Sequence, residues 1–304
     1  MSENFVTVMR YAVTITSVAA VLENILVLAV LAGTKRLRIK YYGFVYNLAL
    51  ADLCFAAFAI SFPWAENSPV FALMMACYIV SILTIFAVAV NRYLALSLMP
   101  PSRYDAVVTG RRLFGVCVLI WAVSLLLNLL PVLTVSPGVM FWIYGLVRPL
   151  TVFIIWLITA IIYIVVFRKI KMYTPPMASN PGVTASAESI QAKTRVRQTR
   201  KLLITFVLIL AACFVCWMPY SIVRVIAFAE PKDLESPIFF DAYWFAGWMY
   251  CISAMINPLI YWGRLDEFRQ GFYALFCRCI VKTDFKEIEL DETEQGKTVG
   301  ETLL

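Results

Sequence analysis

The sequence predicts an all-α membrane protein with seven transmembrane helices, and three observations support this fold class. Apolar residues make up 62% of the 304 residues and charged residues only 15%, whereas soluble domains contain about half apolar and a quarter charged residues. Seven apolar segments each reach the roughly 20 residues that a helix needs to cross a bilayer. The Lys and Arg residues gather on one side of these segments. We therefore expect a helix bundle, followed by a short amphipathic helix on the membrane surface.

The spans lie at about 9–33, 42–63, 69–97, 111–133, 139–167, 200–227 and 237–262. The fourth and fifth are divided at Ser136-Pro137-Gly138, a turn signal inside an uncharged stretch. Residues 172–194 are rich in Pro, Ser and Ala and read as a flexible loop. The expected organisation is a short outer N-terminus (1–8), a seven-transmembrane domain (9–263), an amphipathic helix (264–279) and a disordered cytoplasmic tail (280–304).

The distribution of cations predicts the orientation. Short cytoplasmic loops collect Lys and Arg, and 22 of the 26 belong to the loops after spans one, three and five, to the span ends beside these loops, or to the C-terminal segment. The N-terminus is therefore expected outside and the C-terminus inside, in a multi-pass protein of the plasma membrane. The net charge of +7 then belongs to a cytosolic face that meets anionic lipid and acidic partners, and we do not read it as nucleic-acid binding.

Polar residues inside the spans mark candidate functional positions. Asp52 lies about halfway along the second span, where a charged carboxylate costs roughly 2.5–3.5 kcal/mol on insertion scales. It needs a proton, a cation or polar neighbours. In the third span Ser81 lies three helical turns before Arg92, on the same face, and Asn91-Arg92-Tyr93 ends that span. In the seventh, Ser253, Asn257 and Tyr261 recur every four residues.

The sixth span contains Phe214-Val-Cys-Trp217-Met-Pro219. Pro219 lacks the backbone N–H of the helix ladder and crowds the preceding turn, so a kink is expected there. Phe214 and Trp217 place two large rings near this bend, which can serve as a pivot. Taken alone, the same residues would equally suit a kinked helix with ordinary aromatic packing.

The segment after the seventh span has apolar residues at three- to four-residue spacing, at Leu265, Phe268, Phe272 and Phe276. This predicts an amphipathic helix on the inner membrane surface. Cys277 and Cys279 at its end are candidate palmitoylation sites. The chain ends in Thr302-Leu303-Leu304, a terminus that a PDZ-domain protein could accept.

Together these signals resemble the rhodopsin-like (class A) G protein-coupled receptors from Asn24 to about Cys279. The matching residues are Asn24, Asn47-Leu-Ala-Leu-Ala-Asp52, Arg92-Tyr93, Trp121, Phe214 with Cys216-Trp217-Met-Pro219, and Asn257-Pro258-Leu-Ile-Tyr261.

The resemblance implies a receptor that passes an extracellular ligand signal to heterotrimeric G proteins. It also implies a water-filled pocket that can hold a sodium ion at Asp52, Ser81, Trp217, Ser253 and Asn257. Activation and G-protein coupling would involve Asn91, Arg92, Tyr93, Tyr163, Phe214, Pro219, Pro258 and Tyr261. Arrestin is a further expected partner, and no cofactor is expected besides that sodium.

The chain departs from the family pattern in several places. Asn91 stands where an acid usually precedes the arginine, and no acid lies near Thr199 in the sixth span. Loss of these acids predicts a weaker closed state and elevated basal signalling. The fifth span lacks its usual central proline, and no cysteine matches the usual outer disulfide. These two losses resemble the melanocortin, lysophospholipid, cannabinoid and adenosine receptor subgroup.

Two arginines suggest the ligand's chemistry. Arg224 lies two turns outward of Trp217 on the same face, and Arg148 is at a similar depth in the fifth span. Either could hold a small acidic molecule or lipid by charge-assisted hydrogen bonds, or could extend to lipid headgroups instead. The other ligand-binding candidates are Phe71, Met74, Trp217, Trp244 and Trp248.

Other functional classes fit less well. A seven-span transporter or channel, the main alternative, would need paired repeats or a relay of ionisable groups. The sequence shows no repeat, and the spans contain few ionisable groups. There is no histidine in the chain, and neither a nucleophile with a base nor metal-ligand spacing is found, so we do not expect an enzyme.

Overall fold

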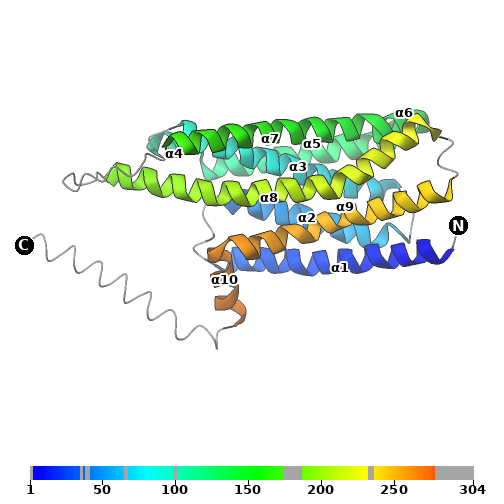
Figure 1. Ribbon diagram of the computed structural model, residues 1–304, viewed down its shortest axis with the longest axis horizontal. Helices are drawn as coiled ribbons and strands as arrows, with labels where there is room; N and C mark the ends of the chain where they lie inside the picture. Colours follow the sequence, from blue (N-terminus) through cyan, green and yellow to red (C-terminus); the bar gives the residue numbers. More distant parts are fainter. Residues whose placement is uncertain are drawn as a thin grey trace, which may run out of the picture.

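The computed structural model describes residues 3–34, 37, 42–64, 68–98, 101–173, 187–231 and 236–277. Every regular element in these ranges is helical, as the predicted all-α class requires. Figure 1 shows long helices running side by side, with the N-terminus and α6 at one end of the bundle and α4 and α10 at the other.

The long helices follow the predicted spans with shifted ends. They are α1 (Glu3–Gly33), α2 (Gly43–Ser61), α3 (Ser68–Ser97), α5 (Gly110–Thr134), α8 (Ala187–Ala229) and α9 (Pro237–Arg264). The fifth span is one uninterrupted helical run made of α6 (Pro137–Trp142), a π-helical segment η3 (Ile143–Val147) and α7 (Arg148–Tyr173). The break between α5 and α6 falls at the Ser136-Pro137-Gly138 turn signal.

Within the described residues, six helical segments are long and apolar enough to cross a membrane: Asn4–Gly33, Gly43–Ser61, Pro69–Ser97, Gly110–Thr134, Pro137–Met172 and Thr199–Ala229. Helix α9 is as long as these, about 42 Å at 1.5 Å per residue, but it is less apolar. Its tyrosines, tryptophans, Asp241 and Asn257 lower its hydropathy. Many of these side chains face other helices, where a polar atom finds a partner inside the protein.

Large apolar side chains cover the outward faces of α5 and α7. Phe114 is 71% exposed and Leu133 is 78% exposed, and similar residues follow along both helices. In water such a surface would be an aggregation hazard. In a bilayer the same side chains contact hydrocarbon, which explains why α5 and α7 bury so little of themselves.

Helix α3 occupies the centre of the bundle. It packs against α2, α5, α7 and α8, while α1 packs between α2 and α9, and α9 in turn packs on α8. Small residues permit this crowding, since Ala72, Ala76 and Ala89 of α3 have no exposed surface.

Two short helices close the end of the bundle that lies away from the N-terminus (Figure 1), which the sequence predicts to be the inner end. Helix α4 (Pro101–Val107) buries Tyr104 completely. Helix α10 (Asp266–Phe276) turns across the end of the bundle (Figure 1) and buries Phe268. At Gly271 an added Cβ would lie only 2.4 Å from Thr34 Oγ1. The amphipathic helix predicted from the sequence therefore packs closely against the end of α1.

One expectation about the inner loop is wrong in part. Residues 172–194 were predicted to be a flexible loop, but α7 continues to Tyr173 and α8 already begins at Ala187. Residues 187–192 (Ala-Glu-Ser-Ile-Gln-Ala) favour a helix, and an existing helix extends readily into such a segment. Residues 174–186, the predicted tail 280–304 and Cys279 lie outside the described residues.

Candidate functional site

The carboxylate of Asp52 is the centre of a polar cluster in the middle of the bundle. Asp52 is 5% exposed. Its Oδ1 accepts a hydrogen bond from Ser81 Oγ of α3 at 2.8 Å, and its Oδ2 accepts one from Asn257 Nδ2 of α9 at 2.7 Å. Three helices are thereby joined at one buried acid, which polar neighbours partly stabilise.

The residues predicted to hold sodium do not all point at this carboxylate. Ser253 donates to the Tyr250 carbonyl oxygen at 2.8 Å, and Trp217 packs edge-on against Tyr78 with ring centroids 4.8 Å apart. Asn257 Oδ1, however, is buried and has no hydrogen-bond partner in the described part of the chain. A carboxylate beside an orphaned amide oxygen and a hydroxyl suits a hard cation, which prefers oxygen ligands.

Two further ties explain other asparagines of the predicted motifs. Asn47 donates to Thr84 Oγ1 at 2.7 Å and accepts from Trp121 Nε1 at 3.0 Å, which joins α2, α3 and α5. Asn24 donates to the Ala254 carbonyl oxygen at 3.0 Å and so joins α1 to α9. Each buried amide is thus a bridge between helices.

Helix α8 contains Pro219 in its interior, and in Figure 1 it changes direction where its colour passes into yellow. Just inward of the bend, Trp217 is 3% exposed. Phe214 packs on Trp156 of α7 with ring centroids 4.3 Å apart. Trp217 therefore contacts Tyr78 of α3, whereas Phe214 contacts Trp156 of α7.

A cavity of about 540 Å³ opens between the halves of the helices that lie toward the N-terminal end of the bundle, predicted to be the outer halves. Of the ligand-binding residues predicted from the sequence, Phe71, Met74, Arg224 and Trp244 line it. Trp217 instead lies beneath Tyr78. Trp248 points toward α1, where its Nε1 donates to Thr16 Oγ1 at 2.9 Å. Neither tryptophan is among the residues that line this cavity, and their contact with a ligand stays a prediction.

The tyrosines around this cavity were missed in the sequence. Tyr144, Tyr220, Tyr243 and Tyr250 all line it. Tyr220 and Tyr243 share a hydrogen bond between their hydroxyl oxygens at 3.3 Å. Their spacing in the sequence could have identified them. Tyr220 is one helical turn from Arg224, and Tyr243 and Tyr250 are two turns apart on one face.

Arg148 and Arg224 together line a second, small cavity of about 20 Å³. Arg148 Nη2 donates to Asn128 Oδ1 of α5, and its guanidinium lies 4.0 Å from the centroid of the Tyr144 ring. Its Nη1 is buried and has no hydrogen-bond partner among the described residues. Asn128 and Tyr144 therefore hold the guanidinium in place, and its Nη1 remains available as a donor to a further hydrogen-bond acceptor.

At the inner end, Arg92 of α3 is 2% exposed and Tyr261 is fully buried. Asn91 accepts a hydrogen bond from Tyr104 Oη of α4 at 2.8 Å. Tyr163 donates to the Ile85 carbonyl oxygen at 3.4 Å. Asn91 is thus a neutral anchor for the short helix α4.

The remaining residues predicted for activation and lipidation differ in their exposure. Tyr93 is 37% exposed, and Lys169 Nζ lies 4.5 Å from the centroid of its ring. Pro258 lies inside α9. Cys277 follows the last turn of α10 and is a free, half-buried thiol.

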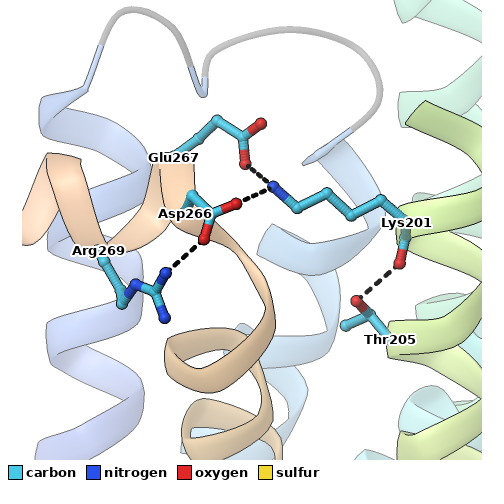
Figure 2. A network of polar contacts seen from close by, with 5 residues as sticks. All are labelled: Lys201, Thr205, Asp266, Glu267 and Arg269. Carbon is cyan, nitrogen blue, oxygen red and sulfur yellow. Dashed lines mark hydrogen bonds and ion pairs between the residues drawn. The ribbon is translucent and has the colours of Figure 1, made fainter. Parts of the chain in front are cut away.

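A group of ions connects α8 to α10 at the same end (Figure 2). Lys201 Nζ lies 2.8 Å from Asp266 Oδ2 and 2.9 Å from Glu267 Oε2, and Arg269 also pairs with Asp266. The hydrogen bond from Lys201 is the first cause that holds the pKa of the Asp266 carboxyl below its usual range. No sequence pattern pointed to this group, because its members are 65 residues apart.

Comparison with known proteins places this architecture in a known group. Residues 23–261 match the family described as 7 transmembrane receptor (rhodopsin family). The chain is 26% identical over 308 positions to the Substance-K receptor of Bos taurus, covering 92% of this chain and 78% of that protein. It is 29% identical over 273 positions to G-protein coupled receptor 6 of Mus musculus, covering 84% of this chain and 71% of that protein. The human Substance-K receptor is 27% identical, with 90% and 74% covered.

Proposed function

Because this chain belongs to the rhodopsin family of seven-transmembrane receptors, we propose that its outer cavity binds a ligand with one acidic group and an apolar body. Family membership makes the chain a G protein-coupled receptor and a multi-pass protein of the plasma membrane. Receptors of this family are not enzymes. A transporter or channel, the alternative considered from the sequence, is not favoured by these relatives.

The observation that carries the ligand proposal is the pair of arginines in one small cavity. Arg148 and Arg224 both line it, and Arg224 also lines the larger cavity. Buried cations are costly without a counter-charge. An acidic group in the larger cavity would accept charge-assisted hydrogen bonds from Arg224, and the available Nη1 of Arg148 borders the adjoining small cavity.

The remainder of the larger cavity suits an apolar ligand body. Its walls are mainly methionines, phenylalanines and the rings of tyrosines and Trp244. A volume of about 540 Å³ is within the range of small-molecule sites, which are mostly apolar with a few convergent polar groups. A lipid with an acidic headgroup, or a small aromatic acid, matches this distribution.

The proposed orientation places the N-terminus and this cavity outside the cell. Support comes from the cations, 22 of 26 of which belong to the opposite side. The N-terminal half of α1 contributes Val13 to the cavity wall. A ligand would then enter from the extracellular side or the outer leaflet.

Activation in this proposal is a population shift. A ligand that binds the open form more tightly than the closed form favours an outward swing of the inner half of α8 about Pro219. Rearrangement of Arg92, Tyr163 and Tyr261 would then open a groove for the G protein. Trp217, packed on Tyr78 beneath the cavity, is positioned to transmit the ligand's presence to the bend.

Sodium would stabilise the closed form at the middle of the bundle. The residues that would hold it are Asp52, Ser81 and the amide oxygen of Asn257. The ion would supply the positive charge that a buried carboxylate otherwise lacks. Ser253 and Trp217, also predicted for this pocket, would border it through Tyr250 and Tyr78.

Further partners remain proposals from the sequence. They are arrestin, a PDZ-domain protein at Thr302-Leu303-Leu304, and membrane lipids at α10. Palmitoylation of Cys277 would add an anchor at the end of α10, where this thiol is half-buried. Cys279, the second candidate, lies outside the described residues.

The ligand proposal is tested by G-protein activation in cells that express the receptor. Fatty acids, lysophospholipids and small aromatic acids are each compared with the neutral amide or ester of the same body. Only the acids should activate, and Arg224→Met should weaken the active acid by roughly 10- to 100-fold, the value of a hydrogen bond to a charged group.

Arg10→Met is the matched control. Arg10 is another cation of the outer half that does not line either cavity, and its guanidinium lies 5.9 Å from the centroid of the Trp244 ring. It should change potency far less than Arg224→Met at equal surface expression. Unchanged potency in Arg224→Met, or equal activity of acids and their neutral analogues, would contradict the proposal.

A further inference from the structure

The ions of Figure 2 connect a helix that is proposed to move with one that is anchored. Lys201 lies near the inner end of α8, and Asp266 and Glu267 form the first turn of α10. Helix α10 is itself fixed against α1, where Gly271 packs on Thr34. The three residues thus tie the inner end of α8 to a stationary part of the protein.

We propose that Lys201, Asp266 and Glu267 form an ionic clamp that holds α8 in its closed position. The proposal rests on the function proposed above, in which the inner half of α8 swings outward. The clamp is autoinhibitory, because its contacts exist only while α8 lies beside α10. Breaking it raises the fraction of open receptor without any ligand.

Because Lys201 lies far from Pro219 along α8, a small change in the bend angle moves Lys201 a long way. Lys201 is 18 residues, or about 27 Å of helix, inward of Pro219. A change of about 10° at the proline would displace Lys201 by roughly 5 Å. In this proposal, a displacement of that size breaks the ion pairs of 2.8 and 2.9 Å, so the closed form alone contains them.

The position of the clamp matches the proposed cytosolic groove. Tyr42 is buried at this end of the bundle, and Glu267 and Arg92 both interact electrostatically with its hydroxyl. Tyr42 is therefore within electrostatic reach of both the clamp and Arg92. The clamp lies at the rim of the groove that a G protein would occupy.

The charges of the clamp also compensate for the residues missing from the third and sixth spans. Asn91 is neutral and is held by Tyr104, and position 199 is a threonine. Here α8 carries the cation and α10 carries the acids. Helix α8 can thus still form an ion pair in the closed state. In this pair α8 contributes the cation instead of an acid, and its partner lies on α10 instead of α3.

A purely local role would explain only half of this arrangement. Acids in the first turn of a helix are favourable to its dipole, which accounts for Asp266 and Glu267 by themselves. It does not account for a lysine 65 residues away that contacts both of them. The side chains of Lys201, Asp266 and Glu267 are 30%, 55% and 44% exposed, so the effect is modest, roughly two- to fivefold in the closed-to-open ratio.

The test uses the full-length receptor with Lys201→Ala, Asp266→Asn/Glu267→Gln, and all three changes combined. Arg200→Ala is the matched control, because it removes an exposed cation from the same turn. Basal G-protein activation is normalised to surface expression. Separately, spin labels on non-canonical amino acids at Val207 and Phe114, both exposed to lipid, report the distance between α8 and α5 in detergent.

Lys201→Ala and the double variant should each raise basal G-protein activation two- to fivefold. The fraction of receptors with the longer distance between α8 and α5 should rise by the same factor. The combined variant should add nothing beyond either, since the interaction is already gone. Arg200→Ala should leave both values unchanged. Additive effects, or an unchanged distance distribution in Lys201→Ala, would overturn the clamp.

The two readouts separate the clamp from the function on which it rests. A receptor that activates no G protein under any condition would count against the proposed function, and the distance distribution would still decide the clamp. If Lys201→Ala lowered basal activity while distances stayed the same, Lys201 would be a G-protein contact, and the clamp would be rejected.

Discussion

The two polar regions of the transmembrane bundle differ in where their partners come from. In the middle, Ser81 and Asn257 both donate to Asp52, and Asn47 pairs with Thr84 and Trp121, so that internal hydrogen bonds join the helices. In the outer half, Arg224 lines a large cavity whose walls are mostly rings and methionines, and it shares a small adjoining cavity with Arg148. The first region completes most of its hydrogen bonds within the protein, while the second leaves cationic donors beside open volume.

This difference separates structural from ligand-binding roles. A buried polar group that is paired internally stabilises one arrangement of helices. A cation next to an apolar cavity gains a strong partner only when an anion arrives. Substitutions in the middle should therefore change stability, and substitutions in the outer half should change ligand response.

The largest expected stability effect comes from Asn47→Ala. The variant loses the hydrogen bonds to Thr84 and from Trp121, and leaves the Trp121 indole N–H without its acceptor. We expect a loss of about 1–3 kcal/mol, measured as a lower thermal midpoint in detergent.

Arg224→Met provides the contrast in the same assay. It removes a cation from the cavity wall and should change the free energy of unfolding by no more than about 0.5 kcal/mol, so the thermal midpoint should stay almost the same. If Arg224→Met destabilised the receptor as much as Asn47→Ala, the distinction between the two regions would fail.

An intermediate effect is expected from sodium. At ten times its dissociation constant, an ion that binds only the folded receptor adds about 1.4 kcal/mol, visible as a midpoint several degrees higher in NaCl than in N-methyl-D-glucamine chloride. Asp52→Asn keeps the shape of the side chain but removes its charge, so the sodium-dependent increment should vanish. An increment that persists in Asp52→Asn would place the ion elsewhere.

The smallest effect should come from Tyr243→Phe at the cavity wall. It removes a hydroxyl that lies 3.3 Å from the Tyr220 oxygen and leaves the ring in place. The loss of one neutral hydrogen bond is worth about 0.5–1.5 kcal/mol, so potency of the acidic agonist should fall by no more than about tenfold. Tyr11→Phe is the control, because its ring is exposed and packs on Trp64. It should leave agonist potency unchanged.

The motif residues of the bundle could be found from the sequence because their spacing is local. Asn257 and Tyr261 are four residues apart in one helix, and Pro219 marks a bend wherever the helix is placed. The structure adds their partners, as when Asn24 reaches the Ala254 carbonyl oxygen 230 residues away. Helix periodicity says which face a residue occupies but not which helix packs against that face.

The cavity was predictable only in part for the same reason. Arg224, Phe71 and Trp244 were expected there and line it, since they lie at the right depth in their spans. Trp248 lies at that depth too, but it is rotated toward Thr16 of α1. Depth is set by position along a helix, whereas rotation is set by packing against neighbours, which no single span encodes.

The sequence by itself determined the all-α class, the long apolar spans, the bend at Pro219 and the family signature, because hydropathy and proline geometry act within one segment. The tertiary structure alone decided which tyrosines surround the outer cavity and that Lys201 meets Asp266 and Glu267. Those contacts join residues far apart in the chain, and their distances exist only once the helices have packed.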